Sequence, residues 1–200
     1  MKNNEILEAM NNFLKQTYGH VLASKIYTEA KNEWEDLCLK NESDSKNVKT
    51  HTEVKIYPMI ALYHAMQNNS IDKKEACRFL DEKLSLMAEK DAESIRSMLK
   101  IPFAYRLMPK IFKKVTLSQF GEKAGFKAKF YNTDKTECKF DMQKCLYCEI
   151  CKKYDCFELV KCFCHTDDVT DGNMHPRIHW NRTKTMGEGD DICDFDITVK

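Results

Sequence analysis

A change in hydrophobic periodicity near Gly121 is the sequence feature that most constrains how this 200-residue chain can fold. Before that glycine, apolar residues recur at the spacing of amphipathic helices. Near the end of the chain, residues 193–199 alternate between apolar and polar, which predicts a strand with Cys193 on its buried face and Asp194 on the other. We therefore predict an α+β protein, with an N-terminal helical layer packed on a C-terminal antiparallel sheet that carries short cysteine-bearing helices.

The same change suggests how the chain is organised. Residues 1–120 form the predicted helical part and residues 121–200 the predicted α+β, cysteine-rich part, and a chain of this length can hold both in one integrated domain. In the helical part, the polar segment 41–50 is expected to be a loop, and Pro58 is expected in the first turn of the next helix. In the second part, residues 175–185 are expected to pair with the last strand.

Further elements are predicted between these landmarks. One helix is expected over 72–87 and another from about Ala92, which prolines interrupt. Strands are expected at 126–131 and 137–142, joined by a turn. Two short cysteine-bearing helices are expected at 144–154 and 157–164.

Charge and hydropathy narrow the classes of function. The formal net charge is +1, whereas nucleic-acid-binding proteins usually gather a basic excess on one face, so no nucleic acid is expected as a partner. No apolar run approaches the roughly 18 residues of a membrane-spanning helix, and the start of the chain lacks the apolar core of an export signal. We therefore expect a cytoplasmic protein without a membrane partner, whose ten cysteines serve packing, metal binding or chemistry rather than a disulfide framework. The oligomeric state is left open.

A series of six cysteines lies close together in the sequence, at Cys145, Cys148, Cys151, Cys156, Cys162 and Cys164. The first three have the spacing of an iron–sulfur sequence, but the residues between them favour a helix, from which three successive thiolates would diverge. A zinc site formed by the pairs Cys145/Cys148 and Cys162/Cys164 is geometrically easier. The other interpretation treats the cysteines as small buried hydrophobic residues, of which one or two are reactive.

Within the segment 162–168, residues 164–168 place a cysteine, a histidine and two aspartates close to one another. A thiolate at Cys164 would need a nearby positive charge, which His165 or Arg182 could supply, because carboxylates alone oppose its formation. The other interpretation is the end of a helix with solvated acidic side chains.

Arg182 shares a predicted strand face with Trp180. A buried charge without a partner is costly, so Arg182 either pairs with a carboxylate of the chain or holds the carboxylate of a ligand bidentately. The acidic turn 187–191 lacks the ligand order of a calcium loop and is predicted to be a plain hairpin turn. His175 and His179 are predicted to be surface residues rather than metal ligands.

Four stretches of the sequence carry a resemblance when they are read together: IYPMIALYHAM (56–66), KCLYCEICKKYDC (144–156), FCHTDD (163–168) and HPRIHWNRTKTMGEGDDICDF (175–195). The most specific pattern is R-T-x-T-x-x-x-G-x-x-x-C-D-F, supplied by Arg182, Thr183, Thr185, Gly189, Cys193, Asp194 and Phe195. A C-x-Y element is supplied by Cys145 and Tyr147, and a C-x-x-D element by Cys164 and Asp167. Over roughly residues 50–199, the chain resembles the bacterial L-2-amino-thiazoline-4-carboxylic acid hydrolase family.

The chain departs from the family pattern in two respects. The cysteines Cys148, Cys151, Cys156 and Cys162 look particular to this chain, which leaves room for a metal role. Asp196 stands where the family pattern has arginine, so one charged contact is expected to be missing. A family member that has lost its activity is therefore a further interpretation.

The resemblance implies a hydrolase that acts on a non-peptide C–N bond of a small cyclic amidine. Water would add to the C=N carbon of the thiazoline ring and give a carbamoyl-cysteine; the partner would be a small-molecule substrate, with no cofactor required. Arg182 would hold the substrate carboxylate. Either Cys164 would attack, or Asp167 would activate water as a general base. Charge stabilisation and protonation would fall to Thr185, Cys145 and Cys193, with Asp194 or Asp168 orienting them.

The rival hypothesis is a cysteine-rich module that senses a metal or a small ligand without turnover. It would bind zinc or iron through Cys145, Cys148, Cys162 and Cys164. A weaker likeness to the vinyl-4-reductase-like small-molecule sensor domains, confined to the C-terminal G-x-x-x-C-x-F ending, belongs to this hypothesis.

Overall fold

The computed structural model describes residues 3–200, and the fold is α+β, with helices in the N-terminal part and an antiparallel sheet in the C-terminal part. The chain divides into two compact units. The first comprises Met1–Lys83 and Ile150–Leu159, and the second comprises Leu84–Glu149 and Val160–Lys200. Each unit is therefore made of two segments, which differs from a division at residue 120.

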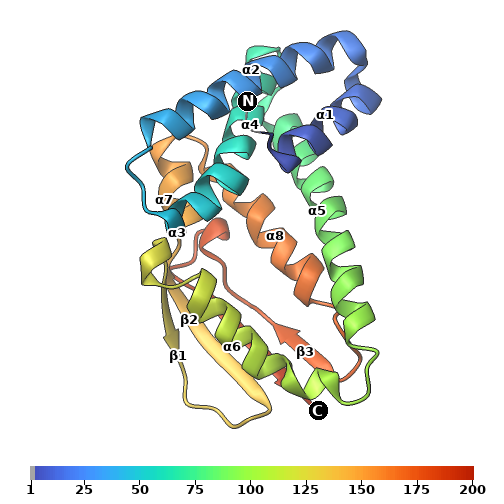
Figure 1. Cartoon of the computed structure of the whole chain (residues 1–200), viewed down its shortest axis with the longest axis vertical. Coiled ribbons are helices and arrows are strands. Elements are labelled where there is room, and N and C mark those ends of the chain that lie inside the picture. Colours follow the sequence, from blue (N-terminus) through green and yellow to red (C-terminus); the bar gives the residue numbers. More distant parts are fainter. Residues whose placement is uncertain (1–2) are drawn as a thin grey trace. The chain divides into compact units, whose positions relative to one another are not determined.

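The first unit is helical. Its elements are α1 (Glu5–Tyr18), α2 (His20–Lys40), α3 (Lys46–His51), a π-helical turn (Thr52–Ile56), α4 (Tyr57–Asn68), the first part of α5 (Lys73–Met98), the end of α7 (Leu146–Lys153) and a 3-10 turn (Phe157–Leu159). Helix α2 packs against both α1 and α4 (Figure 1). Helix α4 is the most buried, because it is apolar on nearly all sides. Pro58 lies in its first turn, as predicted.

Two helical predictions in this part of the chain were wrong in detail. The segment 41–50 is a loop only at its start, because Ser45 accepts a hydrogen bond from the Val48 amide and caps a short helix from Lys46. Helix α5 is continuous where two helices were predicted, because the sequence around residues 88–92 contains good helix formers and neither glycine nor proline.

The second unit contains a four-stranded sheet. Its elements are the rest of α5, a 3-10 turn (Ala104–Leu107), α6 (Met108–Gln119), a 3-10 turn (Glu122–Ala124), β1 (Lys127–Phe130), β2 (Glu137–Lys144), the start of α7, α8 (Val160–Asp171), β3 (Ile178–Asn181), a 3-10 turn (Met186–Glu188) and β4 (Cys193–Val199). The strand order is β1-β2-β4-β3, with antiparallel pairing throughout. The predicted pairing with β4 is confirmed for β3, although β3 is shorter than the predicted strand 175–185.

Helix α6 covers one face of this sheet, against β2 and β4 (Figure 1). The predicted alternation of β4 is confirmed, since Cys193, Phe195, Ile197 and Val199 are buried. Phe195 stacks on Phe140 of β2, with ring centroids 4.8 Å apart. In residues 3–200, no helix is both long enough and apolar enough to cross a membrane.

Candidate functional site

Helix α8 presents a row of polar side chains. Asp167 and Asp168 lie three and four residues after Cys164, and Asp171 lies four and three residues after them, so the four share one side of the helix. The helix continues to Asp171, which places the CHTDD segment within the helix rather than at its end. The row is therefore held on a rigid element.

Arg182, which directly follows β3, reaches this row. Its Nη1 donates to Asp167 Oδ2 at 3.0 Å, and its Nη2 donates to Asp168 Oδ2 at 2.5 Å. Nη2 also donates to the backbone carbonyl of Cys164 at 2.8 Å. The arginine side chain is only 2% exposed, whereas the side chains of Asp167 and Asp168 are 44% and 47% exposed. A buried cation thus holds two carboxylates that remain open to solvent.

Two aromatic rings support the arginine. Its Cζ lies 5.6 Å from the ring centroid of Trp180 and 5.4 Å from that of Phe195, which is within the range of cation–π attraction. The indole of Trp180 also donates to Asp168 Oδ1 at 2.9 Å. Burial acts to lower the pKa of Arg182, but the charges of Asp167 and Asp168 outweigh it and raise the pKa. Of the two roles that the sequence left open for Arg182, the structure displays the pairing with carboxylates of the chain.

Asp171 is a site residue that the sequence analysis missed. Burial, followed by the negative charge of Asp167, raises the pKa of Asp171 to about 7, while Arg182 acts in the opposite direction. Such a carboxyl group can both bind and release a proton near neutral pH. Its spacing of four residues from Asp167 was the available sequence signal.

Hydrogen bonds to Asp194 hold the loop that follows β3 in place. The carboxylate of Asp194 accepts hydrogen bonds from the Thr183 amide at 2.8 Å, the Thr183 hydroxyl at 2.6 Å and the Lys184 amide at 2.6 Å. Burial acts to raise the pKa of Asp194, but these hydrogen bonds outweigh it and lower the pKa. The structure therefore places Asp194 as a residue that positions the loop.

A close approach joins this loop to α8. A Cβ atom at Gly187 would lie 3.0 Å from Cys164 Sγ, 3.1 Å from Val160 Cγ1 and 3.3 Å from the Lys161 amide nitrogen. Glycine therefore lets the turn Met186–Glu188 approach the helix without the crowding that a side chain would cause. The same loop lets the Met186 amide donate to Cys193 Sγ at 3.2 Å. Cys164 and Cys193 are thus brought to the same part of the second unit.

Thr185 contributes a buried hydroxyl to this loop. Its Oγ1 has no hydrogen-bond partner among residues 3–200, although its amide donates to Asp190 Oδ2 at 2.9 Å. Burying a hydroxyl without a partner costs free energy. Thr185 Oγ1 is therefore a buried polar atom that the described residues leave unsatisfied.

The thiols of the site are held in the protonated form. Burial, with a contribution from Asp167, raises the pKa of Cys164 to about 12, and burial raises the pKa of Cys193 to about 11. For Cys145, a hydrogen bond with Cys148 and then burial raise the pKa well above the ordinary value. Cys164 interacts electrostatically with both Cys193 and Cys145, so the three predicted catalytic cysteines do converge. In this state they are hydrogen-bond donors rather than thiolates.

The predicted metal site has no support in the geometry. Within residues 3–200, no group of three or more histidine, cysteine, aspartate or glutamate side chains is placed to hold a metal ion. Cys145 and Cys148 hydrogen-bond to each other, but the set Cys145, Cys148, Cys162 and Cys164 does not gather as a metal centre. Among the described residues, these cysteines therefore show no arrangement that supports a zinc or iron site.

The structure also places His175, His179 and Asp196, which the sequence analysis singled out. The ring of His175 stacks on Tyr105, with centroids 4.7 Å apart, and His179 is exposed. Asp196 lies 3.5 Å from Lys139 Nζ on the neighbouring strand β2, so the two side chains form an ion pair.

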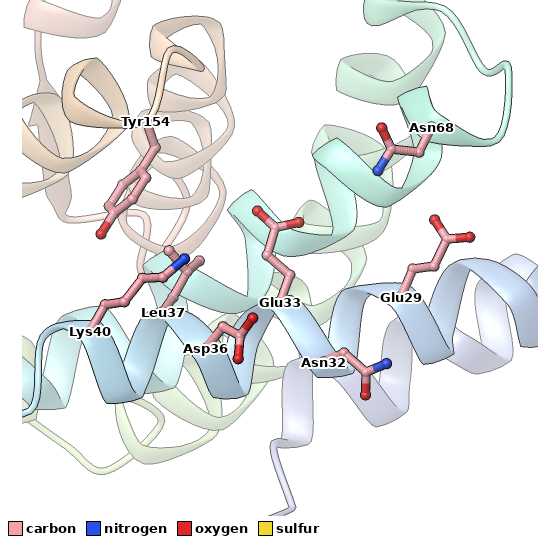
Figure 2. Close-up of a pocket in the computed structure, with 8 residues that line it drawn as sticks. All are labelled: Glu29, Asn32, Glu33, Asp36, Leu37, Lys40, Asn68 and Tyr154. Carbon is pink, nitrogen blue, oxygen red and sulfur yellow. The ribbon is translucent and has the colours of Figure 1, made fainter.

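A pocket of about 460 Å³ lies within the first unit. It is lined by Glu29, Asn32, Glu33, Asp36, Leu37, Lys40, Asn68 and Tyr154, as Figure 2 shows. Three of these side chains are acidic, and none of the residues that the sequence predicted for the site is among them.

Comparison with known proteins identifies a family that this chain matches. The sequence profile of the family described as L-2-amino-thiazoline-4-carboxylic acid hydrolase matches residues 49–197. A search among curated proteins found no match. The matched region covers most of the chain and includes α8, Arg182 and the loop up to Asp194. This chain therefore belongs to the L-2-amino-thiazoline-4-carboxylic acid hydrolase family, whose name denotes a hydrolase.

Proposed function

We propose that the protein hydrolyses L-2-amino-thiazoline-4-carboxylate, or a closely related cyclic amidine, at the site formed by α8 and the loop between β3 and β4. The observation that carries the proposal is the buried Arg182, which fixes two solvent-accessible carboxylates, Asp167 and Asp168, on a rigid helix. Membership of the family supplies the substrate class.

The overall reaction adds water to the amidine carbon of the ring. The water oxygen becomes the carbonyl oxygen of a carbamoyl group, and the ring carbon–sulfur bond breaks so that sulfur leaves as a thiol. Water thus adds across C=N, while the bond that must break to give a carbamoyl-cysteine is C–S. The site must accept a proton from water and deliver one to the departing atom.

Asp167 is the proposed general base. Its carboxylate is nearly half exposed and so can contact a water molecule, while Arg182 fixes its orientation. Asp171 lies one helical turn away, and its pKa of about 7 suits it to exchange the second proton. Cys164 is less well suited to attack the ring itself, because its pKa of about 12 leaves very little thiolate at neutral pH.

The other predicted residues receive roles that match their surroundings. Arg182 already binds two carboxylates and a carbonyl, so its proposed role is to position Asp167. Thr185 Oγ1 is the proposed contact for the substrate, because it is buried without a partner in the described chain. Cys145 and Cys193 act as hydrogen-bond donors, and Asp194 holds the loop that carries Thr185.

The test is a ring-opening assay with L-2-amino-thiazoline-4-carboxylate on protein purified anaerobically, with metal content measured on the same sample. We expect the ring absorbance to fall and one thiol to appear for each ring opened. Asp167→Asn should lower kcat about 100-fold or more with little change in KM, as is typical when a general base is lost. Asp91→Asn, an exposed aspartate of α5, is the matched control and should behave as wild type.

Two results would contradict the proposal. Wild-type kinetics for Asp167→Asn would remove Asp167 as the base. About one equivalent of bound metal without turnover would instead favour the sensor hypothesis, in which the cysteines bind a metal.

A further inference from the structure

A second arrangement of reactive groups lies in the first unit and is not used by the proposed hydrolysis. Helix α7 ends at Lys153, and Asp155 then takes a positive φ of 53°. This turn lets the Cys156 amide donate to the Cys151 carbonyl at 2.9 Å, and Cys156 Sγ lies 3.5 Å from the same oxygen. The turn therefore holds the Cys156 thiol beside Cys151.

A histidine links this thiol to a carboxylate. His64 on α4 has its Nδ1 2.6 Å from Oε1 of Glu33 on α2, and its side chain also hydrogen-bonds to Cys156. The imidazole thus lies between a thiol and an orienting carboxylate, which is the arrangement that activates a nucleophilic cysteine. Glu33 is also part of the pocket wall and extends from α2 toward α4 (Figure 2).

The charges agree with this geometry. Hydrogen bonds with Cys156 and then Glu33 raise the pKa of His64 to about 10, although burial acts against them. A hydrogen bond from Cys151 and the contact with His64 lower the pKa of Cys156 to about 6, again against burial. Both shifts favour transfer of the Cys156 proton to His64, toward a thiolate and an imidazolium.

Other titratable groups surround the pair. Glu158 opposes the thiolate electrostatically, but Lys73 lies 3.6 Å from its carboxylate and Tyr63 donates to it. Cys77 of α5 and Tyr63 of α4 also interact electrostatically with Cys156. Burial raises the pKa of both, so they remain protonated beside the thiolate.

The exposure of these side chains limits which reagents can react with the Cys156 thiol. Cys156 and Cys151 are both 0% exposed, whereas the side chains of His64 and Glu33 are 29% and 30% exposed. Because the sulfur is fully buried, a bulky electrophile is excluded, and the reagent to consider is a molecule of a few atoms. A second thiol in hydrogen-bond contact then stands ready to resolve an oxidised first thiol.

We propose that Cys156, His64 and Glu33 form a reactive-thiol site for a small hydroperoxide, with Cys151 as the resolving thiol. In the first step, the Cys156 thiolate attacks one peroxide oxygen, the O–O bond breaks, and a proton from the His64 imidazolium completes the leaving water or alcohol. Cys156 becomes a sulfenic acid. In the second step, the Cys151 thiol attacks that sulfur, water leaves, and a disulfide forms. Two thiols are oxidised and one peroxide is reduced.

The experiment exposes the reduced full-length protein to hydrogen peroxide, stops the reaction with catalase, and alkylates the remaining thiols after denaturation. Trypsin cleaves after Lys144, Lys152 and Lys153, so Cys151 and Cys156 fall on different peptides and their disulfide joins those peptides. Fragmentation of the crosslinked pair then identifies the joined cysteine, because the peptide 145–152 also carries Cys145 and Cys148. Near pH 7 we expect Cys156 to be consumed at least about ten-fold faster than Cys138, because it is the thiolate. Cys138 is the matched internal control, since it is 2% exposed and burial raises its pKa to about 11.

Two variants separate the roles. Cys151→Ser should stop the reaction at the sulfenic acid, which dimedone traps on Cys156. His64→Gln should change the pH profile: the wild-type rate should level off above about pH 7, whereas the variant rate should still rise through about pH 8. Cys148→Ser is the control for loss of a neighbouring buried thiol and should leave the crosslink intact.

The proposal is overturned if wild-type Cys156 reacts no faster than Cys138, or if the crosslink joins Cys156 to a cysteine other than Cys151. It is also overturned if His64→Gln, folded by circular dichroism, keeps the wild-type pH profile. These readouts use no thiazoline substrate, so they are independent of the hydrolase proposal.

Discussion

At the scale of single residues, the site depends on one buried cation. Arg182 is charged, is 2% exposed and lies against two aromatic rings, so the carboxylates of Asp167 and Asp168 offset its desolvation. The carboxylates themselves keep contact with solvent. Removing the cation should therefore cost less than removing its partners, because the freed carboxylates can be hydrated.

The first prediction compares these two losses by urea unfolding. Arg182→Met should lower the free energy of unfolding by about 1–2 kcal/mol, through lost hydrogen bonds. The double variant Asp167→Asn/Asp168→Asn should lower it by about 3 kcal/mol or more, because it leaves a buried charge without a countercharge. Equal effects of the two changes would contradict the assignment of Arg182 as the buried partner.

A second prediction concerns Asp171, whose pKa is raised to about 7 from an ordinary value near 4. Between these pH values the folded state holds a proton that the unfolded state has released, so this group makes stability fall as pH rises through the window. The contribution is fully present below about pH 4 and is lost above about pH 7. Asp171→Asn should therefore be more stable relative to wild type at about pH 8 than at about pH 5.

Unfolding of both proteins at the two pH values measures this difference. A stability difference that does not depend on pH would show that Asp171 has an ordinary pKa. Asp91→Asn, the exposed aspartate of α5, controls for the general effect of removing one negative charge.

At the scale of elements, helix α8 and the turn Met186–Glu188 determine each other's position. The helix was predictable in kind, since its apolar residues repeat at helical spacing, but its continuation to Asp171 was not. The alternation of β4 placed Cys193 inward and Asp194 outward in advance, because a strand side chain has only two faces to choose from. The pairing of β2 with β4 could not be read locally, because it joins segments far apart in sequence.

A third prediction tests the contact between these elements. Gly187→Ala would place a methyl group 3.0 Å from Cys164 Sγ and 3.1 Å from Val160 Cγ1, so we expect about 1–3 kcal/mol of destabilisation from overpacking. Cys164→Ala removes the nearest of the three obstructing atoms. In thermal or urea unfolding, the Gly187→Ala change should therefore cost less in the Cys164→Ala background. An unchanged cost in that background would show that Cys164 does not limit the approach.

At the scale of the whole molecule, the two interleaved units are held by apolar packing within each unit. In the second unit, Leu99, Met108, Met174, Ile178 and Ile197 belong to one buried cluster. Burial of such side chains supplies about 1.5–3 kcal/mol each. The cysteines add to this packing, since Cys148, Cys151, Cys156, Cys162 and Cys193 are buried.

The fourth prediction follows from that source of stability. Incubation of the reduced protein with a strong chelator should leave Tm within about 1 °C of its original value, because a bound metal would otherwise stabilise the fold by mass action. Differential scanning calorimetry before and after chelation checks this. A fall in Tm accompanied by release of zinc or iron would restore the metal hypothesis for Cys145, Cys148, Cys162 and Cys164.

The sequence by itself determined the α+β class, the inward face of β4, and the stretch from Arg182 to Asp194 as the candidate site, because periodicity and short motifs are local properties. Only the tertiary structure decided the chemical state of the groups. Burial and neighbouring charges come from packing. They raise the pKa of Cys164, so that its thiol stays protonated, and they raise the pKa of Asp171 to about 7. Packing also brings the carboxylates of Asp167 and Asp168 to Arg182. Nor could any local pattern reveal that His64 meets Glu33, 31 residues earlier, because the packing of α2 on α4 brings these two together. The contact of His64 with Cys156, in the turn after α7, likewise depends on tertiary packing.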